Sequence, residues 1–231
     1  YNQKIHAIEK RITKLMLENI KDVSSITIYG SAAYNNYKNC NDIDIIVAVK
    51  KKFWEKLGEE YKLIIAIKNK AKKQGLKLDL EIYTEEAIYE SYPSNISLIY
   101  QLKDSKTVYG ILKLPAKAEI YKLDLRMKTD YSVIEPEDFK EISGLELYKA
   151  IRNLWLIKLI MNKIIDNILL NKVLEDELGK NLVDRLKNNK CLATDKKIAY
   201  LYLNRLLKNT LNEVKEAKWE KLQLYNLWLN A

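Results

Sequence analysis

The spacing of apolar residues predicts a mixed order of helices and strands in the first half of the chain. Apolar residues recur at helical spacing over 3–21, which predicts an amphipathic helix, and a short strand follows at 24–29. A strand is predicted at 42–49. Its second half, 45–49, is apolar on both faces, so we expect it to be covered on both sides. Residues 53–73 are predicted to form a helix that packs on the sheet.

A second strand pattern follows at 76–83, where Leu78, Leu80 and Ile82 alternate with polar residues. Shorter elements come next, with helical turns predicted at 85–90 and 97–103 and a strand at 107–110. The stretch 111–136 is predicted to be irregular or extended, with one further strand at 120–125.

From residue 138 onward the pattern is helical. Three helices are predicted, at 145–170, at 173–187 and from a cap at Asp195 to about 217. The predicted fold class is α+β, with a small mixed β-sheet and flanking helices followed by an α-helical C-terminal domain. The expected divisions are a first domain at 1–112, a linker or extended segment at 113–136, and a helical domain at 137–231.

Composition narrows the classes of function. The 231 residues are 48% hydrophobic and 31% charged, as in a folded protein with a real core. His6 is the only histidine, which excludes a histidine-rich zinc site, and a Ser-His-Asp triad would have to rely on this one residue. Cys40 and Cys191 fit neither a metal spacing nor a disulfide framework, which favours a reducing compartment and a cytoplasmic location. We expect no membrane span, and the chain begins without methionine.

The formal net charge of +9 is spread evenly along the chain. No segment therefore resembles a nucleic-acid-binding arm, and a uniform excess favours polyanions in general, including nucleotides. Whether the chain forms a homodimer through its aromatic-rich helices is left open by the sequence.

The candidate chemistry lies in Gly30-Ser31, followed by Asp42 and Asp44 and then by an acidic strand. Residues i and i+2 of a strand share a face, and two carboxylates held in this way suit hard divalent cations bound together with phosphate oxygens. Asp79 or Glu81 can add a third carboxylate, and three close acids would repel one another without cations. Each acid alone also fits a wet strand face or a turn cap; the combination with Gly-Ser favours the metal site.

These residues resemble the DNA polymerase β-like nucleotidyltransferase superfamily. Its mark is an apolar residue, Gly, then Gly or Ser, an acid-apolar-acid triplet about ten residues later, and a further acid on a strand. The resemblance covers roughly residues 1–112 and implies a polymerase β-like palm. The run Leu78-Asp79-Leu80-Glu81-Ile82-Tyr83-Thr84-Glu85-Glu86 is also similar to the kanamycin (aminoglycoside) nucleotidyltransferases. This closer similarity favours Asp79 over Glu81 as the third acid.

One departure concerns phosphate binding. Members of the superfamily often have an arginine a few residues after Gly-Ser, whereas here the nearest cation is Lys38. Gly30, Ser31 and Lys38 are therefore the expected nucleotide-binding residues, with Lys38 or another lysine in place of the arginine. Aminoglycoside enzymes also use a glutamate of the C-terminal domain as general base, for which Glu137, Glu141 and Glu146 are candidates.

The resemblance implies transfer of a nucleoside monophosphate from an NTP, with ATP favoured, to an acceptor hydroxyl. Asp42, Asp44 and Asp79 would be the catalytic residues and would bind two Mg²⁺ ions. The acceptor stays open between an aminoglycoside, an RNA end, a protein hydroxyl and a second nucleotide. An aminoglycoside is a polycation that needs an acidic pocket, for which six acids are candidates: Glu85, Glu86, Glu90, Glu135, Glu137 and Asp138. The alternative is a catalytically silent, antitoxin-like nucleotide-binding module, which the missing arginine supports and the three acids oppose.

Overall fold

The structure is a computed structural model and describes residues 2–34, 37, 40, 42–51 and 58–225. The chain divides into two compact units. One is formed by the residues through Lys117 together with Tyr225, and the other by Ala118–Leu224. Within the described residues, no helix is long and apolar enough to cross a membrane.

The first unit is built on a four-stranded sheet in the order β3-β2-β1-β4. Strands β1 and β2 are antiparallel, as are β1 and β4, whereas β2 and β3 are parallel. The strands are β1 (Val23–Tyr29), β2 (Ile43–Val49), β3 (Leu78–Thr84) and β4 (Lys106–Gly110). The helices are α1 (Asn2–Asn19), α2 (Gly30–Tyr34), α3 (Glu59–Lys73), α4 (Glu85–Ser91) and α5 (Ile96–Lys103).

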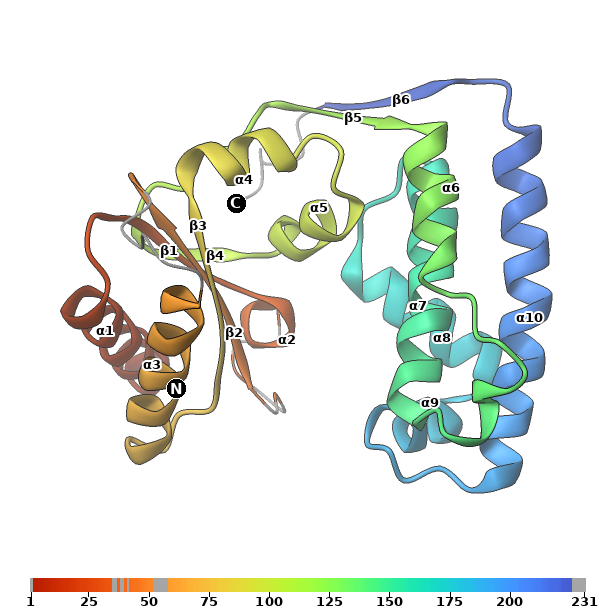
Figure 1. Cartoon of the computed structure of the whole chain (residues 1–231), viewed down its shortest axis with the longest axis horizontal. Helices are drawn as coiled ribbons and strands as arrows, with labels where there is room; N and C mark the ends of the chain where they lie inside the picture. Colours follow the sequence, from red (N-terminus) through yellow and green to blue (C-terminus); the bar gives the residue numbers. More distant parts are fainter. Residues whose placement is uncertain (1, 35–36, 38–39, 41, 52–57, 226–231) are drawn as a thin grey trace. The chain divides into compact units, whose positions relative to one another are not determined.

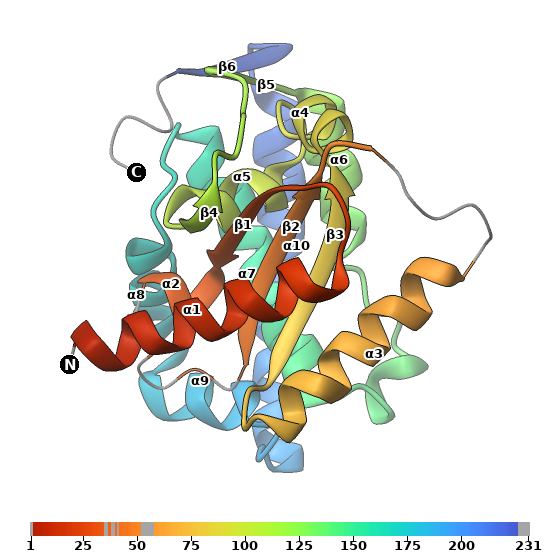
Figure 2. The ribbon, with the colours of Figure 1, turned by 90° about the vertical axis from the view of Figure 1, so that its left-hand side faces the viewer.

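One face of this sheet carries the main core of the unit. Helices α1 and α3 lie across it side by side (Figure 2). Met16 of α1 and Ile67 of α3 are fully buried against Ile45 and Val47 of β2, within a cluster that also takes in the apolar face of β3. Burial of this continuous aliphatic surface is the main force that fixes the sheet and its register.

The alternation in β3 follows from the same register. Leu78, Leu80 and Ile82 are buried in the core, so Asp79, Glu81 and Tyr83 must point to the opposite face. The strand ends where Thr84 caps α4 by accepting a hydrogen bond from the Ala87 backbone N–H at 3.1 Å. Glu85 and Glu86 occupy the first turn, where negative charge complements the helix dipole.

The second unit is helical, as the sequence predicts, but its helices are shorter. Its elements are β5 (Lys117–Tyr121), α6 (Lys122–Asp130), the 3₁₀ turn η1 (Asp138–Lys140), α7 (Gly144–Met161), α8 (Asn167–Leu178), α9 (Lys180–Lys187), α10 (Ala193–Glu216) and β6 (Lys221–Tyr225). Helix α7 is buried along most of its length, and α6, α8, α9 and α10 pack around it (Figure 1).

Three sequence predictions for this region are wrong. The helix predicted at 145–170 is broken after Met161, because Lys163 has a positive φ of 59° and Asp166 caps a new helix. The helix predicted at 173–187 is divided at Gly179, whose φ is 80°. The segment 113–136, predicted to be irregular or extended, contains helix α6, whose first turn is held by a hydrogen bond from the Tyr121 backbone N–H to Asp124.

Strand β6 has no counterpart in the sequence prediction. It pairs with β5 in a two-stranded sheet, so that the chain enters and leaves the helical unit along neighbouring strands. Lys221 lies 3.3 Å from Glu119, and the Lys122 backbone N–H donates to the Glu220 carbonyl at 2.9 Å. The short alternating run at 221–225 is stabilised by this distant pairing.

Candidate active site

The predicted carboxylates lie on the sheet face opposite α1 and α3. The parallel register pairs Ile43 with Leu78 and Asp44 with Asp79, so the second and third predicted acids are direct neighbours on adjacent strands. Asp42 immediately precedes β2 and Ile43 is buried on the other face, which places Asp42 on the side of Asp44. The register therefore brings the backbone positions of the three predicted acids to one corner of the sheet.

Asp44 is held against the turn that follows β1. Gly30 has a φ of +64°, and a Cβ added there would lie 2.3 Å from Asp44 Oδ2. Glycine is therefore required twice, for its left-handed backbone and for the absence of a side chain that would displace the carboxylate. The Gly-Ser pair of the sequence motif and the second acid are parts of one packed arrangement.

Asp44 shares this corner with like charges. Its pKa is raised to about 6, mainly because burial disfavours the ionised form, with Asp42 and Asp79 adding repulsion. Burial also raises the pKa of Glu81, which follows Asp79 on the same face. Tyr29 is paired with Asp44 across β1 and β2, and the pKa of its buried phenol is raised by burial and by the carboxylates.

Two lysines neutralise the outer acids. Lys68 of α3 donates to Asp79 at 2.9 Å, and Lys77 lies 3.7 Å from Asp42. The part of the chain that the structure describes contains no group of three Cys, His, Asp or Glu side chains arranged to hold a metal ion. The strand register thus places the three acids at one corner of the sheet, but the side chains of Asp42 and Asp79 form ion pairs with lysines.

The chemistry of the donors nevertheless fits a hard divalent cation. The candidate ligands are carboxylates, whose oxygens Mg²⁺ prefers. Repulsion from Asp42 and Asp79 adds to the burial that raises the pKa of Asp44, and a bound cation would relieve this repulsion. Asp42, Asp44 and Asp79 are the residues that would hold such ions, once Asp42 and Asp79 exchange their lysine partners for them.

The chain between α2 and β2 is anchored at described points. The Tyr37 backbone N–H donates to the Ala32 carbonyl at 2.8 Å, and the Tyr37 hydroxyl donates to Glu9 at 3.1 Å. Glu9 is only 8% exposed and also accepts from Lys106 at 2.7 Å. Lys38, the third expected nucleotide-binding residue, lies outside the described residues.

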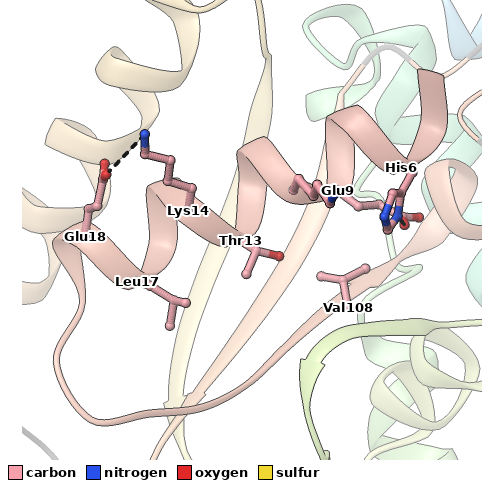
Figure 3. Close-up of a pocket in the computed structure, with 8 residues that line it drawn as sticks. His6, Glu9, Thr13, Lys14, Leu17, Glu18 and Val108 are labelled. Atoms are coloured by element: carbon pink, nitrogen blue, oxygen red, sulfur yellow. Dashed lines mark ion pairs between the residues drawn. The ribbon is translucent and has the colours of Figure 1, made fainter. Parts of the chain in front are cut away.

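A separate surface pocket runs along α1. It has a volume of about 520 Å³ and is lined by residues of α1 with Val108 of β4 (Figure 3). Its lining contains none of the three predicted acids, and its most buried polar residue, Glu9, is already bound by Tyr37 and Lys106. We therefore place the candidate active site at the corner of the sheet that carries Asp42, Asp44 and Asp79, called the carboxylate corner below. We assign no chemistry to the pocket along α1.

One candidate general base has a structural role. Glu146 accepts a hydrogen bond from the Ser143 backbone N–H at 2.7 Å and closes a capping box at the start of α7. These hydrogen bonds lower the pKa of Glu146, which weakens it as a base. Glu141 follows η1, and Glu137 precedes it.

Sequence reasoning missed the lysines. The run Lys77-Leu78-Asp79 contains the signal, since residues 77 and 79 of an alternating strand share a face. Lys68 carried no comparable signal, because its approach to Asp79 depends on how α3 packs against β3.

Part of the chain matches a known protein family. Residues 10–105 match the family described as polymerase beta, nucleotidyltransferase, which spans β1 to β3 and the carboxylate corner. None of the proteins with curated descriptions matches the sequence.

Solved structures give the fold. Spectinomycin adenyltransferase AAD(9) from Enterococcus faecialis, solved with ATP and spectinomycin, is 18% identical with a TM-score of 0.55, covering 86% of this chain and 97% of that one. A toxin–antitoxin structure with AMP-PNP is 21% identical with a TM-score of 0.33, covering 45% and 73%. The toxin–antitoxin MntA–HepT is 20% identical with a TM-score of 0.29, covering 45% and 70%.

The likeness to the adenyltransferase confirms the α+β class with a polymerase β-like sheet and a helical C-terminal region. The family match itself is limited to residues 10–105, the part of the chain that is similar to a polymerase β nucleotidyltransferase domain.

Proposed function

We propose that the protein transfers a nucleoside monophosphate from an NTP, with ATP favoured, to an acceptor hydroxyl and releases pyrophosphate. The observation that carries this proposal is the pairing of Asp44 with Asp79 across β2 and β3, with Gly30 packed on the Asp44 carboxylate. Two Mg²⁺ ions, when bound, would neutralise phosphate charge and lower the pKa of the acceptor hydroxyl.

The residues divide the work by position. Asp42 and Asp44 would hold both ions, and Asp79 would complete the coordination of the second on the side of the acceptor. The Gly30-Ser31 turn would approach the phosphates closely, with the Ser31 hydroxyl donating a hydrogen bond to a phosphate oxygen. In the reaction, the acceptor oxygen bonds to the α-phosphorus, the bond from that phosphorus to the bridging oxygen breaks, and the acceptor proton is lost to a nearby base or to water.

Labelled nucleotide tests the proposal. The full chain is incubated with α-labelled ATP, Mg²⁺ and each acceptor class in turn, namely kanamycin, tRNA and a hydroxyl-bearing protein. Transfer to one class is expected, and the Asp42→Asn variant should lower the rate by roughly 1,000-fold with an unchanged melting temperature. The exposed Asp176 of α8 supplies the matched control, Asp176→Asn, which should keep full activity. Substantial activity in Asp42→Asn would falsify the assignment.

The alternative is a catalytically silent nucleotide-binding module. The observation in its favour is that Lys77 and Lys68 already pair with Asp42 and Asp79. Calorimetry separates the two functions: Mg²⁺-dependent binding of ATP without modification of any acceptor supports the silent module.

A further inference from the structure

Lys77 is placed on the catalytic face by the register of the sheet. The Ile43 backbone N–H donates to the Lys77 carbonyl at 2.9 Å, and the next pair is Ile43 with Leu78. Lys77 and Asp42 thus stand opposite each other one step before Ile43 and Leu78. Because Leu78 is buried on the core side, Lys77 shares the face of Asp79.

The contact between Lys77 and Asp42 is loose. The Nζ atom lies 3.7 Å from Asp42 Oδ2, and the two side chains are 72% and 40% exposed. An exposed pair of this kind contributes little to stability, and the long stem of lysine lets the ammonium group move to another partner. The pair can therefore be exchanged at low cost.

The site also needs a cation for the nucleotide. Asp42, Asp44, Asp79 and Glu81 already concentrate negative charge, and a triphosphate adds more. The six residues that follow Gly30-Ser31, at 32–37, include neither lysine nor arginine. Lys77 lies opposite Asp42, and Asp44 lies two positions further along β2, about 6.5–7 Å away. A phosphate bound beside these two acids would therefore lie within reach of the Lys77 side chain.

We propose that Lys77 is a nucleotide-binding residue that Asp42 holds while the site is empty. When Asp42 takes up a divalent cation, the ammonium group of Lys77 is released and binds phosphate oxygens of the nucleotide. This inference rests on the proposed function and adds a residue to it. Lys68 differs, because it comes from α3 on the covered face and reaches Asp79 at the outer edge strand β3.

The proposal predicts that Lys77→Met changes the affinities for metal and nucleotide in opposite directions. Calorimetry on the full chain measures the affinity for Mn²⁺ alone and then the affinity for a non-hydrolysable ATP analogue at saturating Mg²⁺. Lys77→Met should bind Mn²⁺ about 3-fold more tightly, since the competing ion pair is gone. The same variant should bind the analogue roughly 10-fold more weakly, since a charge-assisted hydrogen bond to phosphate is lost.

Two further variants make the test specific. Lys77→Arg should restore nucleotide affinity, because it keeps the charge and the reach. Lys72→Met makes the same charge change on the exposed side of α3 and should alter neither affinity. Unchanged analogue binding by Lys77→Met, in a protein whose wild type binds both ligands, overturns the role of Lys77 alone. A wild type that binds neither Mn²⁺ nor the analogue overturns the proposed function as well.

Discussion

Asp195 and Asp44, two carboxylates in different units, have opposite electrostatic surroundings, and their pKa values are shifted in opposite directions. Asp195, in the helical unit, has a side chain that is 8% exposed and accepts two hydrogen bonds from the Arg185 guanidinium, at 2.7 and 2.8 Å. It also accepts from the Leu192 backbone N–H at 2.9 Å. The Arg185 guanidinium lowers the pKa of Asp195, so its charged form is well accommodated.

Asp44 is in the reverse situation. It is partly buried beside other acids, and its pKa is raised to about 6. A group that is poorly accommodated in the folded state costs stability, and such groups concentrate at functional sites. The difference is consistent with a structural role for Asp195 and with the catalytic role proposed for Asp44.

The largest effect should come from Gly30→Ala. The new methyl carbon would lie only 2.3 Å from Asp44 Oδ2, so the carboxylate must move, and we expect nucleotidyl transfer to fall by about 100-fold or more. Gly75→Ala is the control: its φ of +72° imposes similar strain, but nothing lies within 4 Å of the added carbon. Steady-state kinetics on both variants should show the loss in Gly30→Ala alone. Equal losses would mean that backbone strain, rather than contact with Asp44, limits this position.

The second largest effect should be a loss of thermal stability when Asp195, the carboxylate paired with Arg185, is replaced. Asp195→Ala removes the carboxylate that accepts from the Leu192 backbone N–H at the start of α10 and leaves Arg185 without this partner, so the melting temperature should fall by roughly 5–10 °C. Thermal denaturation followed by circular dichroism measures this, with the exposed Asp176→Ala as reference. If the melting temperature of Asp195→Ala falls no more than that of Asp176→Ala, Asp195 contributes no more to stability than an exposed surface acid.

Asp44→Asn should act in the opposite direction. The folded state binds a proton at Asp44 more readily than the unfolded chain, so ionisation of Asp44 destabilises the fold as pH rises from about 4 to about 6. Above pH 6, without divalent cations, the variant should melt about 2–5 °C higher than the wild type. Below pH 4 the gain should vanish, since both states are protonated there. Melting curves across this range would contradict the assignment if the gain were independent of pH.

The smallest effect should come from an uncharged group on the same sheet. The Ser25 hydroxyl is buried and has no hydrogen-bond partner among the described residues, so Ser25→Ala should be neutral or stabilising by up to ~1 kcal/mol. Thr27 lies on the same strand, and its hydroxyl is hydrogen-bonded to that of Thr107 at 3.0 Å. Urea denaturation should therefore show a loss for Thr27→Val and none for Ser25→Ala.

Much of the first unit could be predicted from local patterns. The strands at 24–29, 42–49 and 76–83 each lie within two residues of β1, β2 and β3 at either end, because their alternation or apolar run is strong. The helical unit was less predictable, since its breaks depend on single residues such as Lys163 with a positive φ. Strand β6 is stabilised by a partner about a hundred residues away, which no local pattern reveals.

The candidate site divides in the same way. The spacing of Gly30-Ser31, Asp42, Asp44 and Asp79 indicated nucleotidyl chemistry, and the family match agrees. The sequence could not reveal that Lys68 and Lys77 pair with two of these acids, because a lysine side chain chooses its partner only after the sheet and α3 have packed. The similarity of Thr84-Glu85-Glu86 to the kanamycin enzymes has a local explanation, the N-terminal cap of α4.

The paired strands β5 and β6 have a consequence for how this chain can be modified. Lys117 and Tyr225, at either side of the helical unit, lie close enough for the Lys117 ammonium to stand 5.9 Å from the Tyr225 ring. The 107 residues between them therefore leave and rejoin the first unit at nearly one point. Such a segment can be exchanged for another of different length without stretching the backbone of the first unit, which makes Lys117 and Tyr225 suitable junctions for replacing the helical unit.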